Sequence, residues 1–194
     1  MSYILHNRLG SGGFVVEATL ELAGLEYTYE PIESKPNTPV QERIAHINPW
    51  GQVPVLEVPN GKVLTEVAAI ICYLTQSENA CHSGPNLWNN DYASFLRWSI
   101  FMSVNIYEGI LRQSYPYRYF DFSSSSNTES SAREAVIDTA IKTGMALSVK
   151  MSARKRVHKA FLLLEEIIHK DEFLLGPQMS CCDIFLAMLY AWHN

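Results

Sequence analysis

Residues 48–70 read NPWGQVPVLEVPNGKVLTEVAAI, and this stretch decides the fold. Val55–Val58 is a short apolar run of the kind that forms a sheet strand. The Asn60-Gly61 dipeptide after it is typical of a tight hairpin turn, which leads into a second short strand at Val63–Leu64. The stretch therefore predicts an antiparallel hairpin.

Pro54 heads the first of these strands, where a sheet would need an N–H donor. A cis Val53–Pro54 bond removes the conflict, because the chain then turns and presents the backbone N–H and C=O of Val53 outward. Backbone groups exposed in this way can pair with an extended peptide by strand addition. The sequence therefore predicts a cis bond and a peptide-binding edge at Val53.

The hairpin runs directly into a helix predicted over Glu66–Gln76. Since a helix N-terminus favours a carboxylate, the N–H groups of Glu66 and Val67 are candidates to bind one. The Glu66 side chain can bind an ammonium group. A small peptide with a free amino-acid end would satisfy Val53, Glu66 and Val67 together.

The rest of the chain divides at residue 77. Four elements are predicted before the hairpin: a strand at Tyr3–His6, a helix ending near Gly24, a second strand near 25–32 and a short helix over 39–47. With the hairpin and the helix after it, the order is βαβαββα. The first two strands are predicted to be parallel, through a right-handed crossover. Residues 77–87 resemble a linker, and the domains are predicted as 1–77 and 88–194, the second all-helical. Its predicted helices include Asn90–Ser114 and Arg154–His169, with a polar loop over 122–133 that leads into a helix.

Composition excludes several classes of protein. The chain has 194 residues, 47% of them hydrophobic and 18% charged, which is enough for one ordinary core or two small ones in contact. A net charge of −5 argues against nucleic acid as a partner. Neither a membrane span nor a signal peptide is indicated, so we expect a cytoplasmic protein.

The four cysteines do not form a metal or redox motif. No Cys-x-x-Cys motif occurs among them, and no second pair completes a zinc site; the four are Cys72, Cys81, Cys181 and Cys182. The vicinal pair Cys181-Cys182 fits either a redox sensor or two small packing residues, and packing is the commoner role. No metal is expected.

The last helix carries a clear start signal in PQMSCCDIFLAMLYAW, residues 177–192. Ser180 suits the N-cap position, and Asp183 can reach back to the N–H of Ser180, while Met179 and Ile184 occupy the positions of a hydrophobic staple. This motif predicts only where a helix begins, and we assign Ser180 and Asp183 to folding rather than to chemistry.

The order and spacing of NPWGQVPVL, LTEVAAI, the helical second half and SCCDIFLAMLYAW resemble the cytosolic glutathione S-transferase family, from end to end of the chain. The resemblance is to its Ser/Cys-type, bacterial-like members. It implies a thioredoxin-like N-terminal domain, an all-α C-terminal domain, a homodimer and a role in detoxification. It also implies that the peptide is glutathione, as co-substrate, bound by Gln52, Val53, Pro54, Glu66 and Val67.

The resemblance further implies that the glutathione thiol is activated by a hydroxyl between the first strand and the first helix, where Ser11 lies. A charge-assisted hydrogen bond and the helix dipole would favour the thiolate. The alternative is that Ser11 is only an N-cap in a flexible turn. Tyr3 is a rival hydroxyl with a probable packing role, and His6, Asn7 and Arg8 are further polar candidates at the mouth of the site.

Tyr107, Leu111 and Tyr115, spaced by four, could line the site of a small hydrophobic electrophile, although such a stripe is more often core. Family members often continue beyond the position of Asn194 into helices that cover this site, so an open site is expected.

One residue departs from the family pattern: Val67 stands where the family usually has Ser, whose hydroxyl helps to hold the γ-glutamyl carboxylate. The backbone N–H remains, so we expect weaker binding by about 0.5–1.5 kcal/mol, the value of one hydrogen bond. Two functions therefore stay open, a glutathione transferase acting on a small electrophile and a non-catalytic module of the same fold that binds a protein partner.

Overall fold

The computed structural model describes residues 2–33, 40–76, 91–122, 132–168 and 170–193. The N-terminal part contains β1 (Tyr3–Asn7), α1 (Gly13–Leu22), β2 (Tyr27–Pro31), α2 (Val40–Ile44), β3 (Val55–Glu57), β4 (Val63–Thr65) and α3 (Val67–Leu74). The second part is helical, with α4 (Tyr92–Phe101), the π-helical segment η1 (Met102–Tyr107), α5 (Glu108–Ser114), the 3-10 turn η2 (Pro116–Arg118), α6 (Ala132–Ile168) and α7 (Cys181–His193). The predicted fold, a thioredoxin-like βαβαββα domain followed by an all-α domain, is confirmed.

The four strands form one mixed sheet in the order β2-β1-β3-β4. β1 and β2 are parallel and β3 and β4 are antiparallel, as predicted. β1 and β3 are also antiparallel, a pairing for which the sequence analysis made no prediction. The hairpin between β3 and β4 closes at Gly61, whose φ of 81° is one that glycine adopts without steric cost. The predicted boundary of the two domains, and Cys81, lie outside the described residues.

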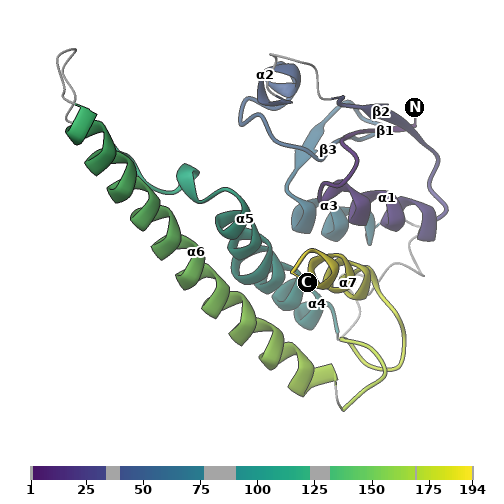
Figure 1. Cartoon of the computed structure of the whole chain (residues 1–194). Helices are drawn as coiled ribbons and strands as arrows, with labels where there is room; N and C mark the ends of the chain where they lie inside the picture. The colour runs from purple at the N-terminus through teal and green to yellow at the C-terminus, as the bar shows by residue number, and fades with distance from the viewer. Residues whose placement is uncertain (1, 34–39, 77–90, 123–131, 169, 194) are drawn as a thin grey trace.

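Two hydrophobic layers hold the helices to the sheet and the two parts to each other. Helices α1 and α3 lie side by side on one face of the sheet, and α7 and α4 lie beyond them (Figure 1). The inner layer between sheet and helices includes the fully buried Leu5, Leu20, Leu56 and Ile70. The outer layer joins Val15, Val67 and Ile71 of the N-terminal part to Phe95, Met102, Ile106, Val157 and Phe185 of the helical part. Because one continuous apolar cluster spans the junction, α1 and α3 have fixed neighbours in the helical part.

The helix predicted over 90–114 is interrupted by a π-helical segment. α4 ends at Phe101, and η1 follows over six residues before α helix resumes as α5 at Glu108. The side-chain amide of Asn105 donates to the carbonyl oxygen of Phe101 at 3.0 Å, and Arg156 of α6 donates to the Asn105 side-chain oxygen at 2.7 Å. Periodicity alone gave no sign of this interruption, since the residues on each side of the π-helical segment keep a helical pattern of their own.

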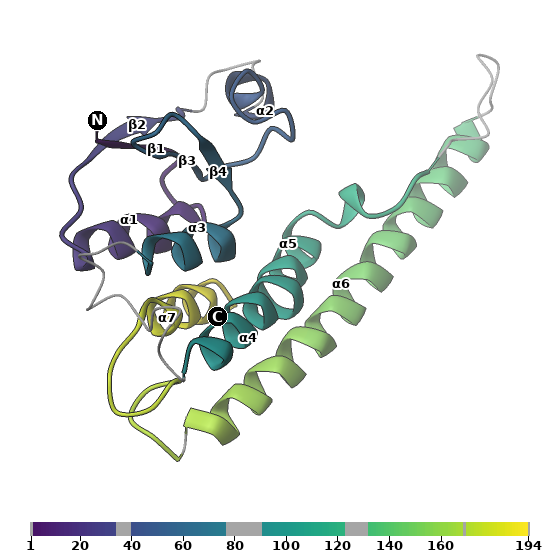
Figure 2. The same ribbon diagram turned by 180° about the vertical axis from the view of Figure 1, so that it is seen from behind.

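Helix α6 is longer than predicted. The expected helix over Arg154–His169 is the second half of one helix, Ala132–Ile168, which runs beside α5 and extends past it at its Ala132 end (Figures 1 and 2). Gly144 is its one glycine, and no proline interrupts it. Within the described residues, no helix has the length and apolar character needed to cross a bilayer.

Three cysteines are packed at or near the junction of the two parts. Cys181 and Cys182 are fully buried, and the Sγ of Cys182 lies 3.1 Å from the Ser99 hydroxyl oxygen. Burial raises the pKa of Cys72 to about 11 and that of Cys182 to about 12. Thiols that stay protonated at neutral pH are poor nucleophiles, which favours the packing role over a redox sensor.

The start of α7 is held by Asp183. Its Oδ2 accepts hydrogen bonds from the backbone N–H of Ser180 at 2.8 Å and from the Ser180 hydroxyl at 2.9 Å, and its Oδ1 accepts from the N–H of Leu174 at 2.8 Å. The predicted bond from Asp183 back to Ser180 is confirmed. Asp183 also joins α7 to the preceding loop, which the sequence did not indicate.

We expect Asp183→Ala to destabilise the protein more than Ser180→Ala. Ser180→Ala removes one bond and should cost about 0.5–2 kcal/mol, as other cap substitutions do. Asp183→Ala leaves the N–H groups of Ser180 and Leu174 without their partner, which raises the cost to about 1–3 kcal/mol. Chemical denaturation of both variants measures this difference, and equal midpoints would contradict the role of Asp183 as the shared acceptor.

Candidate functional site

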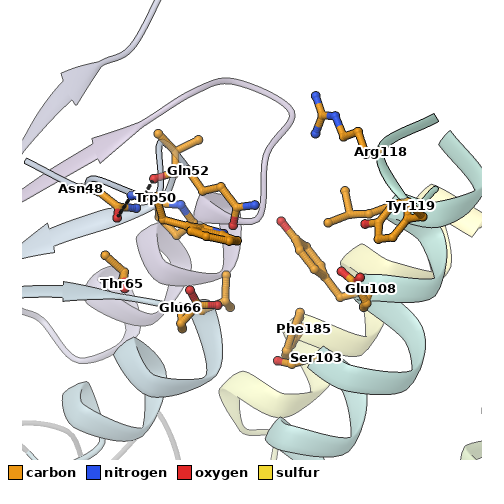
Figure 3. A pocket seen from close by; sticks show the side chains of 15 residues that line it. Asn48, Trp50, Gln52, Thr65, Glu66, Ser103, Glu108, Arg118, Tyr119 and Phe185 are labelled. Atoms are coloured by element: carbon orange, nitrogen blue, oxygen red, sulfur yellow. Dashed lines mark hydrogen bonds between the residues drawn. The ribbon is translucent and has the colours of Figure 1, made fainter. Parts of the chain in front are cut away.

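A cavity of about 450 Å³ lies between the thioredoxin-like part and the helical part. In Figure 3, Asn48, Trp50, Gln52, Thr65 and Glu66 form one wall, and Ser103, Glu108, Tyr119 and Arg118 form the other. We call it the first cavity. All five residues predicted to bind glutathione, Gln52, Val53, Pro54, Glu66 and Val67, line it.

The Val53–Pro54 segment takes the predicted form. The bond is cis, and ladder pairing in β3 begins only at Val55, so Val53 lies beyond the end of the strand. The preceding turn is held by the buried Asn48, which donates from Nδ2 to the Gln52 carbonyl at 2.9 Å and accepts from the Trp50 N–H at 3.1 Å. Val53 therefore stands at the cavity wall on a braced loop.

Glu66 has a backbone conformation that its sequence does not indicate. Its φ is 69°, the one positive φ of a non-glycine residue within the described ranges. Residues held in this region cluster at ligand sites, because the surrounding structure must maintain an unfavourable conformation. Glu66 precedes the first turn of α3, and its exposed side chain lines the first cavity.

Ser11 is buried at the N-terminus of α1. Its hydroxyl donates to the side-chain oxygen of Asn7 at 2.5 Å and accepts from the Gly13 N–H at 3.2 Å. A hydroxyl has one proton, which here is given to Asn7. The Oγ therefore also acts as a local cap on the start of the helix, beside the predicted role toward a thiol.

Tyr107 places a second hydroxyl at the same helix end, from the other side of the junction. The backbone of Gly12 hydrogen-bonds the Tyr107 hydroxyl, and a methyl group on Gly12 would lie 2.8 Å from that oxygen. Burial raises the pKa of Tyr107, so its hydroxyl keeps its proton near neutral pH and can donate it. Trp192 packs against its ring with centroids 5.7 Å apart.

A second cavity of about 500 Å³ adjoins the first. The two share Gln52, Val53, Tyr107, Leu111 and Arg118. Ser11, Arg8, Ile110, Tyr115 and Trp192 line only the second cavity. The three residues predicted for an electrophile site, Tyr107, Leu111 and Tyr115, thus meet around this second cavity together with Ser11.

Sequence reasoning missed several residues of the two cavities. Asn48 and Trp50 line the first cavity, and the Asn-Pro dipeptide, which favours turn initiation, could have pointed to Asn48. Thr65 and Arg118 also line it. Nothing in the sequence pointed to Arg118, because it comes after the end of the periodic helix and lies in a turn among aromatic residues. Of the other polar candidates, Arg8 lines the second cavity, while His6 pairs with Glu57 at 2.6 Å.

Residues 15–77 match the family model described as glutathione S-transferase, N-terminal domain. This match assigns residues 15–77 to the N-terminal domain of the glutathione S-transferase family. The search of curated proteins found no match to this sequence.

Solved structures of glutathione transferases match the fold across the whole chain. A glutathione transferase homolog from Sulfitobacter with bound glutathione gives a TM-score of 0.73 at 16% identity, covering 99% of this chain and 82% of that one. A glutathione transferase from Methylococcus capsulatus gives 0.68 at 20%, covering 98% and 81%. One from Phanerochaete chrysosporium in complex with oxidized glutathione gives 0.72 at 19%, covering 98% and 78%. At these identities the likeness establishes the fold alone, a thioredoxin-like domain followed by a helical domain.

Proposed function

We propose that this protein is a glutathione transferase that binds glutathione in the first cavity and adds its thiol to a small electrophile. The observation that carries this proposal is that Val53, Glu66 and Val67 line one cavity. Glutathione has a backbone that can pair with Val53, together with an α-carboxylate and an ammonium that suit the start of α3 and the Glu66 carboxylate. The glutathione-bound relatives support the same ligand.

In this arrangement the glutathione sulfur lies near Val53 and the N-terminus of α1. Ser11 is our candidate for the hydroxyl that stabilises the thiolate, as expected for Ser/Cys-type members. Its proton must then turn from Asn7 to the sulfur, a change of one rotor that replaces a neutral hydrogen bond by a charge-assisted one. The electrophile would enter the second cavity beside Tyr107, Leu111 and Tyr115.

The alternative function is a non-catalytic module that binds a protein partner. Val67 favours it, since this side chain is buried in the junction and a methyl group on Gly12 would lie 3.0 Å from its Cγ2. Val67 therefore fills space between α1 and α3 and offers no hydroxyl to a γ-glutamyl carboxylate. The hydrogen bond that the Ser11 hydroxyl donates to Asn7 also favours the partner-binding module, because the one proton of this hydroxyl is already in use.

A glutathione titration separates the two functions. We expect the protein to be retained on immobilised glutathione and eluted by free glutathione. We also expect the thiol of bound glutathione to show thiolate absorbance at a pH below about 8.5, the pKa of a free thiol. Glu66→Gln should lower glutathione affinity by about 10-fold, the value of a weak charged hydrogen bond. Glu57→Gln removes the same charge outside both cavities and should leave the affinity unchanged. Absence of both retention and thiolate absorbance would instead favour the partner-binding module.

We also propose, from the family resemblance, that the protein is a cytoplasmic homodimer. Analytical ultracentrifugation of the full chain tests the dimer, and a monomer at micromolar concentration would contradict it.

A further inference from the structure

The charge of the second cavity is opposite to that of the whole protein. The chain carries a net charge of −5, yet the lining of the second cavity contains Arg8 and Arg118 and no aspartate or glutamate. The first cavity, by contrast, has Glu66 and Glu108 beside Arg118. A cationic concavity in an acidic protein attracts anions locally, because its walls exclude water and focus the field.

Arg8 supplies a positive charge to this cavity. Its Nε is buried and has no hydrogen-bond partner among the described residues. Its charge also acts on the Tyr107 hydroxyl: burial raises the pKa of Tyr107, and the positive charge of Arg8 opposes that rise. Arg8 therefore brings its positive charge to the second cavity, close to the hydroxyl at the N-terminus of α1.

Arg118 covers the opening from the helical side. Figure 3 shows its guanidinium extending over the space between the two walls. The guanidinium stacks on the ring of Tyr115, with its carbon 4.3 Å from the ring centroid. This stacking leaves the edge of the planar group, with its fork of N–H donors, available to a carboxylate.

The helical side of the second cavity is largely apolar and aromatic. Ile110, Leu111, Tyr115 and Trp192 line it together with Tyr107. Flat aromatic side chains favour a planar apolar ligand through offset or edge contacts. The cavity thus combines a surface for a flat apolar group with two guanidinium groups.

We propose that the second cavity selects an aromatic electrophile that carries a carboxylate or another anionic group. This inference rests on the proposed glutathione transfer, with the aromatic ring against Tyr115 and Trp192 and the anion between Arg8 and Arg118. The thiolate sulfur attacks the electrophilic carbon of this acceptor, where an S–C bond forms as the bond to the leaving group breaks. The leaving group departs with the electron pair, and the thiol proton goes to solvent.

Glutathione itself carries a glycyl carboxylate, which is a second source of the same chemistry. With its cysteine at Val53 and its γ-glutamyl end at Glu66, the glycyl end would point along Gln52, Trp50 and Asn48, within the first cavity. Arg8 lines only the second cavity, which assigns it to the acceptor. Arg118 lines both cavities, and we assign it to the acceptor as well because its guanidinium stacks on Tyr115, which lines only the second cavity.

The test compares two benzylic electrophiles with the same reacting carbon and the same bromide leaving group. One is 4-(bromomethyl)benzoate, and the other is its neutral methyl ester. Each enzymatic rate is divided by the uncatalysed rate with glutathione. We expect kcat/KM for the benzoate to exceed that for the ester by about 10-fold, the value of one charge-assisted hydrogen bond.

The variants Arg8→Gln and Arg118→Gln should reduce this preference, and the double variant should abolish it, while the KM for glutathione stays within about two-fold. Arg97→Gln is the matched control, because Arg97 is exposed on α4, stacks on Trp98 and lies outside both cavities. It should leave the preference unchanged. Equal rates for the two electrophiles in the parent would overturn the proposal. An increased KM for glutathione with an unchanged preference would assign the two arginines to the glycyl carboxylate instead.

A binding measurement keeps this inference separate from the proposed function. Isothermal titration with 4-methylbenzoate and with the neutral 4-methylbenzamide needs no glutathione and no chemical step. Tighter binding of the benzoate, lost in the Arg8→Gln/Arg118→Gln variant, would support the anion site even if no glutathione were conjugated. Equal binding of the two compounds, with active conjugation, would overturn the anion site and leave the transferase function standing.

Discussion

Replacing Ser11 by Ala is expected to slow glutathione conjugation near neutral pH by about 10- to 100-fold. This range corresponds to one charge-assisted hydrogen bond of about 1.5–3 kcal/mol. Without the hydroxyl, the pKa of the bound thiol rises toward that of a free thiol, so a higher pH should restore part of the rate. Glutathione affinity should change little, because Val53, Glu66 and the Val67 N–H do not involve Ser11. Thiolate absorbance and a pH–rate profile measure both effects.

Tyr107→Phe is the informative companion to Ser11→Ala. It removes the other hydroxyl at the start of α1, the one that the Gly12 backbone hydrogen-bonds. If Tyr107→Phe raises the thiol pKa and Ser11→Ala does not, the thiolate is held by the tyrosine and Ser11 is a cap. Loss of the Asn7 and Gly13 bonds can destabilise Ser11→Ala, and thermal denaturation reports this separately. A change in stability alone does not move the pH profile.

Gly109→Ala is expected to destabilise the protein at the contact between α5 and α6. Gly109 is buried in α5, and a Cβ at this position would overlap with Cγ2 of Val157 in α6. Val157 is fully buried and β-branched, so it cannot turn away. Overpacking of this kind costs about 1–3 kcal/mol, which outweighs the roughly 1 kcal/mol that alanine gains over glycine in a helix. Each kcal/mol should lower Tm by about 2–4 °C in a chain of this size.

Two further variants test whether the overlap is the cause. In Gly109→Ala/Val157→Ala the space is released, so the two substitutions should be less destabilising together than the sum of each alone. Gly144→Ala is the matched control, because it lies in α6 with nothing within 4 Å of the added methyl group. It should stabilise the protein slightly. A Gly109→Ala variant as stable as the parent would mean that α5 and α6 can separate at this point without cost.

Most of the fold could be predicted from the sequence, because its local signals agreed with one another. The hairpin at 55–65, the parallel first pair of strands, the cis Val53–Pro54 bond and the Asp183 cap each rest on residues close in the chain. The convergence of Val53, Glu66 and Val67 on one cavity followed from the same stretch.

Other features had no signal in the spacing of the sequence. The approach of Tyr107 to Gly12 joins residues far apart in the chain and arises where the two parts pack. The positive φ of Glu66 and the hydrogen bond from Ser11 to Asn7 are local, but no residue pattern indicated them. The full length of α6 was missed because its mostly exposed first half carries no strong apolar period.

The π-helical segment determines the direction in which the side chains of α5 point around the helix axis. An α-helix turns by about 100° per residue, so accommodating an extra residue in a wide turn swings the downstream side chains around the axis. Tyr107 is the last residue of that segment, and Leu111 lies one turn further on. Arg156 and Asn105 brace the wide turn away from both cavities. The contact between Arg156 and Asn105 therefore affects the angle at which the helix presents Tyr107 and Leu111 to the two cavities.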